Sequence, residues 1–171
     1  MGIYQGDFVT SCYSVSGLQN LLEITFTSRL DKSIPVLRER ALVIFEEDIR
    51  NVELLKTLKA KMVIQMLPPH RYDGSLTFDE SLIFEGKELL HGEKFKLTIP
   101  LSSIVDLHLG YDDVFVGKDS KGKKYQLTPV RIKYRQNDIA RTMYVFAEYK
   151  GLFRSSSGEE FYKVLKSKVN V

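Results

Sequence analysis

The chain has 171 residues, of which 43% are hydrophobic and 27% are charged, and its formal net charge is +3. These values fit one generous globular domain, or a smaller domain with a substantial extension. The charge is too small to indicate a nucleic-acid-binding protein, and no segment has the ~18 consecutive apolar residues of a membrane-spanning helix. The single cysteine, Cys12, excludes an internal disulfide and a thiolate-rich metal site. With no signal-peptide pattern at the N-terminus, we expect a cytoplasmic protein.

Two strands are predicted before residue 46. Leu22, Ile24 and Phe26 alternate with polar residues, which is the pattern of a half-buried strand. Residues 41–45 are all apolar and are followed by three acidic residues, which is typical of a strand covered on both faces. The N-terminal third is therefore expected to contribute strands to the fold.

A helix is predicted from Asp48 to Met62. Its apolar residues recur at spacings of three and four, and Asp48 is a suitable N-cap. Residues 62–66 then have the pattern of a strand that stops at the following prolines. Because no linker rich in Gly, Ser or Pro comes before those prolines, we expect residues 1–66 to form a strand-and-helix segment packed on a main domain of residues 67–171.

The rest of the chain consists mostly of short strand patterns separated by turns. Turn-forming residues recur about every 8–12 positions, which is typical of an antiparallel β-sandwich or barrel. We therefore expect a mainly β fold of the α+β class. The expected strands are residues 76–78, 82–84, 95–101, 105–109, 125–127, 130–134 and 143–149.

The stretch Ile-Pro-Leu-Ser-Ser-Ile predicts a corner between two of these strands. Pro100 cannot donate a hydrogen bond to a neighbouring strand, so it should end the first strand. The hydroxyls of Ser102 and Ser103 are expected to satisfy backbone groups at the bend. Strict alternation in the next strand would place Ile104, Asp106 and His108 on one face, and Val105, Leu107 and Leu109 on the other.

An amphipathic helix is predicted near the C-terminal end. Ser157 and Glu160 form a capping-box pattern, and Phe161, Val164 and Leu165 form one apolar stripe. Because a sheet of short strands leaves one end open, we expect this helix to cover that end with the three apolar side chains buried.

Antiparallel strands closed by one amphipathic C-terminal helix resemble a pleckstrin-homology-like (PH-like) domain. The sequence GSLTFDESLIFEG (residues 74–86) is similar to the opening hairpin of the GRAM and bacterial PH branches of that superfamily. IPLSSIVDLHLG (residues 99–110) is similar to their segment in which a strand ends at proline and a Ser-Ser pair leads into the next strand. The resemblance covers residues 60–169 and implies a PH-like barrel with a C-terminal capping helix.

A narrower similarity is to the archaeal chemotaxis adaptor family. It rests on a DFV segment (residues 7–9), an IPLS.I.D segment (residues 99–106) and an R.KYR-like strand (residues 131–135). This resemblance implies a non-catalytic adaptor in a taxis-type signalling pathway.

The candidate catalytic and metal-binding residues do not form a recognisable arrangement. His70, His91 and His108 lie far apart in the sequence and lack metal-ligand spacing, so we interpret them as scaffold residues. The Asp112-Asp113 pair lacks the ligand pattern of a calcium loop and fits a turn. We therefore expect no enzyme activity, no catalytic residue, no metal site and no cofactor.

A set of basic residues is the candidate binding site. Its lysines belong to the turn KDSKGKKY, and its other members share one face of the strand RIKYR, opposite Ile132 and Tyr134. These residues could bind an anion, but nearby aspartates offset their charge, so we prefer the interpretation of a simply solvated surface. The PH resemblance implies that lipid binding would also need a basic cluster between the first two strands, where this chain has Asp79 and Glu80. The candidate residues are Lys121, Lys123, Lys124, Arg131, Lys133 and Arg135.

Three functions stay open on the sequence. The first is a non-catalytic adaptor that binds a protein partner through an exposed sheet edge or through the groove beside the C-terminal helix. The second is a membrane-surface module that binds anionic lipid headgroups through the basic residues. The third is a small enzyme or a ligand-binding barrel. We prefer the first, with a protein partner and no nucleic acid.

Overall fold

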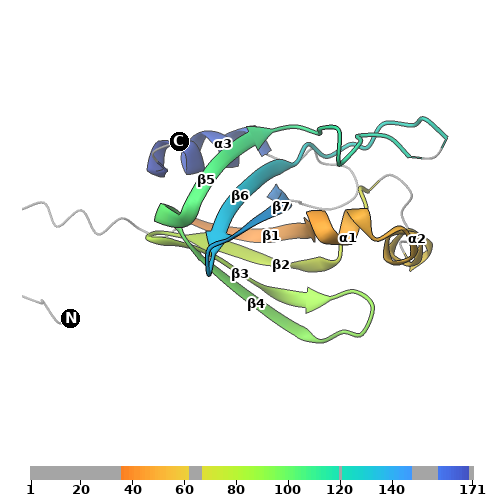
Figure 1. The fold of residues 1–171 in the computed structure, drawn as a ribbon, viewed down its shortest axis with the longest axis horizontal. Helices are drawn as coiled ribbons and strands as arrows, with labels where there is room; N and C mark the ends of the chain where they lie inside the picture. Colours follow the sequence, from red (N-terminus) through yellow and green to blue (C-terminus); the bar gives the residue numbers. More distant parts are fainter. Residues whose placement is uncertain (1–35, 62–66, 120, 148–157, 170–171) are drawn as a thin grey trace, which may run out of the picture. The chain divides into compact units, whose positions relative to one another are not determined.

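The computed structural model describes residues 36–61, 67–119, 121–147 and 158–169 (Figure 1). All of them belong to the unit Ser33–Val171, the second of two units into which the chain divides. The predicted strands at 22–26 and 62–66, the cap residue Ser157, Cys12 and the DFV segment lie outside the described residues.

Seven of the apolar stretches form antiparallel strands of one curled, half-barrel sheet (Figure 1). The described strands occur in the spatial order β4-β3-β2-β1-β7-β6-β5. This arrangement confirms the prediction of a mainly β, antiparallel fold. The strands are β1 (Val36–Phe45), β2 (Tyr72–Phe78), β3 (Ser81–Glu88), β4 (Lys94–Pro100), β5 (Ile104–Leu109), β6 (Val130–Gln136) and β7 (Ile139–Ala147).

β1 and β7 lie at the centre of the sheet and are buried on both faces. Every residue from Ala41 to Phe45 and from Met143 to Ala147 is buried. This confirms the prediction that residues 41–45 form a fully covered strand. Because β1 pairs with both β2 and β7, a strand from the predicted N-terminal segment is hydrogen-bonded to strands that come later in the chain.

The two faces of the sheet carry separate hydrophobic cores. We call the face that packs against the C-terminal helix α3 (Gly158–Lys168) the inner face. Alternation along β1 sends Val43 to the inner core and Ile44 to the core on the outer face. Two short helices, α1 (Glu46–Arg50) and α2 (Val52–Lys61), and the loop between β5 and β6 contribute the other residues of the outer core.

α3 packs against β5, β6 and β7 and completes the inner core. Phe161 and Leu165 are fully buried, as predicted, whereas Val164, which was also expected to be buried, is only half-buried against the inner core. The ring of Phe161 meets the ring of Phe78 edge-on, with their centroids 5.9 Å apart. Since Phe78 belongs to β2, α3 contacts both halves of the strand order.

The prediction of one continuous helix from Asp48 to Met62 was wrong, because the structure has two helices there. Asn51 is extended (φ −83°, ψ 96°) and separates α1 from α2, and its side-chain oxygen accepts a hydrogen bond from the Leu54 amide at 3.1 Å. Asp48 is not the N-cap; it lies inside α1, and its carboxylate accepts a hydrogen bond from the Phe45 amide at 3.2 Å. The break also leaves Val52 60% exposed, whereas the predicted stripe would bury it.

The corner between β4 and β5 is confirmed, but the predicted faces of β5 are not. A 3₁₀ turn, Leu101–Ser103, follows Pro100, and Ser103 Oγ donates a hydrogen bond to the Pro100 carbonyl at 2.8 Å. A β-bulge between Ile104 and Asp106 then inserts one extra residue, so strict alternation fails. As a result Ile104 is buried in the inner core, beside the half-buried Leu107 and Leu109, and Val105 is exposed.

The strand predicted at 125–127 is absent from the described part of the β5–β6 loop. One bridge joins Lys118 to Lys124, and the Tyr125 amide donates to the Gly117 carbonyl at 3.1 Å. Leu127 is buried in the outer core, which explains the apolar pattern without a paired strand.

β2 and β3 approach each other closely where Gly74 is paired with Gly86. A Cβ atom on Gly74 would overlap the carbonyl oxygen of Glu85, and one on Gly86 would overlap the carbonyl oxygen of Asp73. These are backbone atoms of paired strands, so they cannot move aside without disturbing the ladder. Both positions therefore require glycine.

None of the described helices is both long enough and apolar enough to span a membrane.

Replacing Phe161 with Ala should lower the free energy of unfolding by about 3–5 kcal/mol, because a fully buried ring is lost and a cavity remains. Lys163→Ala, on an exposed position of the same helix, is the control and should change it by less than about 0.5 kcal/mol. Urea unfolding measures both values. Equal stability of the two variants would contradict the packing of α3 in the inner core.

Candidate functional site

The predicted lysines occupy the exposed tip of the β5–β6 loop. Lys121, Lys123 and Lys124 are all exposed. The carboxylate of Asp119 accepts hydrogen bonds from the amides of Lys121 at 2.9 Å and Lys123 at 2.8 Å, so it shapes the turn. Gly122 has a φ of +77°, a conformation that favours glycine.

The three basic residues of β6 lie on the outer face, as predicted from alternation. Ile132 and Tyr134 occupy the inner core, and Lys133 and Arg135 are exposed. The loop leaves the sheet at the Val130 end of β6, so Lys133 and Arg135 lie progressively farther from it along the strand (Figure 1). Anion binding by the whole set stays a prediction.

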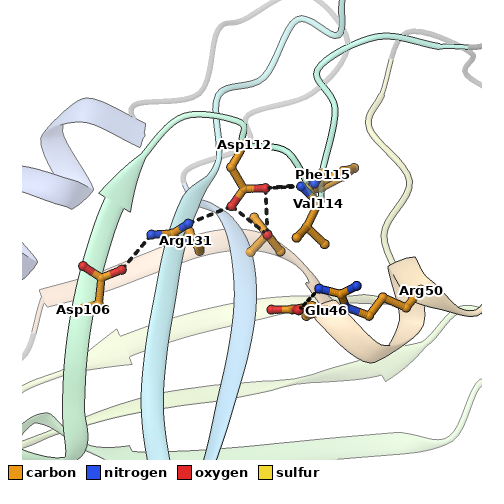
Figure 2. A network of polar contacts seen from close by, with 8 residues as sticks. Glu46, Arg50, Asp106, Asp112, Val114, Phe115 and Arg131 are labelled. Carbon is orange, nitrogen blue, oxygen red and sulfur yellow. Dashed lines mark hydrogen bonds and ion pairs between the residues drawn. The ribbon is translucent and has the colours of Figure 1, made fainter.

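Arg131 is already engaged by two carboxylates of the chain (Figure 2). Its Nη1 donates to Asp112 Oδ2 at 2.9 Å, and its Nη2 donates to Asp106 Oδ2 at 2.7 Å. Arg131 is therefore held between β5 and the loop that follows it. Asp112 was among the aspartates expected to offset the basic charge, but no sequence pattern indicated that Asp106 and Asp112 bind Arg131 directly.

Asp112 is the centre of this network and fastens the loop to the sheet. Its carboxylate accepts hydrogen bonds from the amides of Val114 at 3.0 Å and Phe115 at 2.9 Å, which confirms its interpretation as a turn residue (Figure 2). It also accepts from the hydroxyl of Tyr144 on β7 at 2.9 Å. Phe115 is thereby placed in the outer core, edge-on to the ring of Tyr144.

The protonation states of Asp112 and Tyr144 favour the hydrogen bonds that fasten the loop to the sheet. Burial alone would raise the pKa of Asp112, but hydrogen bonds from the Phe115 amide, Arg131 and Tyr144 outweigh it and lower the pKa below its ordinary value. Burial, together with the adjacent Asp112 carboxylate, raises the pKa of Tyr144. At neutral pH the carboxylate is therefore an acceptor and the phenol a donor.

A second network joins α1 to the β2–β3 hairpin. The guanidinium of Arg71 donates to Asp48 Oδ1 and to Glu88 Oε1, both at 2.7 Å, and both carboxylates are buried. His91 Nδ1 lies 2.8 Å from the other oxygen of Glu88. The hydrogen bond with His91, opposed by burial and supported by Arg71, lowers the pKa of Glu88. No sequence spacing indicated this cluster, because its members come from separate elements.

The histidines of the described segments do not form a metal site. Nδ1 of His70 lies 3.0 Å from the Pro68 carbonyl oxygen, and burial lowers the pKa of His70. Within the described ranges, no three His, Cys, Asp or Glu side chains are gathered closely enough to hold a metal ion.

The strands at the two ends of the sheet, β4 and β5, leave backbone groups available. Each pairs with only one neighbour among the described strands, β4 with β3 and β5 with β6. Phe95 and Leu97 on β4, and Leu107 and Leu109 on β5, pack on the inner core but are only half-buried. An edge strand of this kind is a template for pairing with a further extended segment.

Compared with known proteins, the chain matches no family model, no curated protein and no solved structure.

Replacing Asp112 with Asn should lower the free energy of unfolding at pH 7 by about 1–3 kcal/mol, because charge-assisted hydrogen bonds are lost. The pKa of Asp112 is lower in the folded than in the unfolded state, so its stabilisation is present above the unfolded value of 3.8 and is lost as the pH falls through the folded value. The difference between wild type and variant should therefore shrink below about pH 4.

Asp113→Asn, a change at the exposed neighbouring position, is the matched control for this measurement. Urea unfolding at several pH values supplies the data for all three proteins. A difference between wild type and the Asp112 variant that stays constant down to pH 2–3 would contradict the network.

Proposed function

We propose that this protein is a non-catalytic binding module that recognises a protein partner through an open edge of its sheet. The observation that carries the proposal is the pair of edge strands, β4 and β5, each with one neighbour among the described strands. The outward N–H and C=O groups of such a strand can pair with an extended segment of another protein, and alternate side chains then supply specificity.

The proposal includes assignment of the unit to the PH-like superfamily. Support comes from two antiparallel meanders, β1–β4 and β5–β7, joined by the pairing of β1 with β7 and followed by a C-terminal helix on the inner face. The resemblance of residues 74–86 and 99–110 to GRAM and bacterial PH sequences adds to it. An adaptor role in a taxis-type pathway in the cytoplasm is part of the same proposal and rests on the sequence resemblance alone.

The charged residues support a binding role more than a catalytic one. Asp112 accepts hydrogen bonds from Arg131 and Tyr144, and Asp48 and Glu88 accept hydrogen bonds from Arg71. The shifts in the pKa values of Asp112 and Tyr144 move both groups away from neutrality, whereas a general acid or base works best with a pKa near the working pH.

Weak contact with anionic lipid is the second candidate function, favoured by the exposed lysine turn. Lys121, Lys123 and Lys124 project from a loop tip, and each basic group near an anionic surface contributes about 1 kcal/mol. Arg131 is held by Asp106 and Asp112, which leaves a smaller basic set than the sequence suggested.

Hydrogen–deuterium exchange tests the edge proposal. In the free protein, alternate amides of β4 and β5 should exchange rapidly, because alternate N–H groups of an edge strand point away from the sheet. β1 and β7, which are paired on both sides, are the internal control and should exchange slowly.

A partner captured from an extract of the source cells should slow exchange of the edge amides. Protection confined to residues 118–124, produced by anionic vesicles at ~150 mM salt, would favour the lipid candidate instead. A partner that leaves the amides of both edge strands unprotected would contradict the proposed mode of binding.

A further inference from the structure

β3 and β4 place two lysines directly opposite each other on the outer face. Lys87 of β3 is paired with Lys94 of β4, and neither forms an ion pair with any residue that the structure describes. Like charges in directly opposite positions of an antiparallel pair are destabilising. A third lysine, Lys96, follows on the same face of β4 and is paired with Glu85 at 2.5 Å. The outer face at this edge therefore carries a net positive charge.

A surface depression of about 440 Å³ lies among these side chains. Gly86 and Phe95 are paired between the lysine pair and the Lys96–Glu85 pair. The residues that line the depression are Glu85, Gly86, Lys87, Lys94, Phe95 and Lys96.

Of the two edge strands, β4 is the more regular template. All seven of its residues are in register with β3, from Lys94 opposite Lys87 to Pro100 opposite Ser81. β5 is interrupted by the bulge after Ile104, which disturbs the ladder. α3 also packs against β5, and β4 has no such neighbour among the main helix contacts.

We propose that the β4 edge receives an extended, acidic segment of a protein partner as an additional strand. This inference rests on the proposed function and specifies its edge and its partner chemistry. Residues two apart in a strand share a face, so Lys94 and Lys96 fit a segment with acidic residues at alternate positions. Its carboxylates would lie opposite Lys94 and Lys96, with Lys87 one strand behind, and would offset the positive charge of the lysine pair.

A second copy of this chain fits the edge less well than an acidic segment does. Antiparallel pairing of β4 with another β4 along its whole length would place Lys94 opposite Pro100 and Lys96 opposite Thr98, so it would supply no carboxylate opposite either lysine. Lysine on an edge strand is a recognised means of preventing such self-association. Charge complementarity therefore favours an acidic partner over a homodimer at this edge.

Peptides of about nine residues, long enough to pair along the whole of β4, test the proposal with the full-length chain. One peptide alternates Glu with Val, and a second has Lys in place of each Glu. The acidic peptide should bind measurably by fluorescence anisotropy, with weaker binding at higher salt, and should slow exchange of the β4 amides. The basic peptide should bind at least about ten-fold more weakly.

The Lys87→Glu/Lys94→Glu variant should reverse this preference between the two peptides. Lys121→Glu/Lys123→Glu, with the same change in net charge on the distant loop, is the matched control and should keep the wild-type preference. Thermal unfolding checks that both variants remain folded. Equal binding of both peptides to the wild type, or loss of preference in the control variant, would overturn the proposal.

The outcome for this inference can be separated from that for the proposed function. A natural partner that protects β5 amides and leaves β4 unprotected would overturn the β4 assignment while keeping a sheet edge as the binding site. A self-associated protein, with β4 amides protected in a concentration-dependent way, would overturn the acidic-partner assignment in favour of a second copy. A preference for the acidic peptide, together with slower exchange of the β4 amides, supports both the proposed function and the assignment of an acidic partner to β4.

Discussion

β1 is hydrogen-bonded on one side to β2 and on the other to β7, and the rest of the unit depends on this double pairing. Without it, β2–β4 and β5–β7 would be two separate meanders. With it, they form one sheet whose two middle strands need cover on both faces. The inner cover is α3, and the outer cover is α1, α2 and the β5–β6 loop. Each covering element follows from the need to bury apolar side chains of the central strands.

The covering elements of the outer face are fastened by buried and partly buried charges as well as by apolar contact. Asp112 holds the β5–β6 loop to β6 and β7, and Arg71 holds α1 to β2 and β3. Such networks recover little net stability after desolvation, but removing one member leaves a buried charge unpaired. Their main contribution is to fix where the loop and the helix lie. The polar groups therefore fix the positions of the loop and of α1, while burial of apolar groups supplies most of the free energy of folding.

The sequence was informative where a pattern is local. Alternation predicted the sides of β6, the continuous run predicted β1, and the i, i+3, i+4 stripe predicted α3. It was less informative where one residue interrupts the alternation of a strand or the periodicity of a helix. The bulge after Ile104 and the break at Asn51 are such places, because each changes the direction of the side chains that follow. The charge networks were beyond its reach. Arg71 and Asp48, or Arg131 and Asp106, meet only because particular elements are neighbours in space, which no local pattern encodes.

The contact between Gly74 and Gly86 has a consequence for how the sequence can evolve. Any nucleotide substitution that changes a glycine codon to that of another amino acid adds a side-chain atom, and at both positions that atom would meet the backbone of the opposite strand. A compensating change at the second position cannot help, because it too adds volume. Exposed neighbours on β3 such as Glu85 and Lys87 can change in charge and size, but this pair of glycines cannot. Among diverged relatives, two glycines twelve positions apart should therefore persist longer than most of their neighbours.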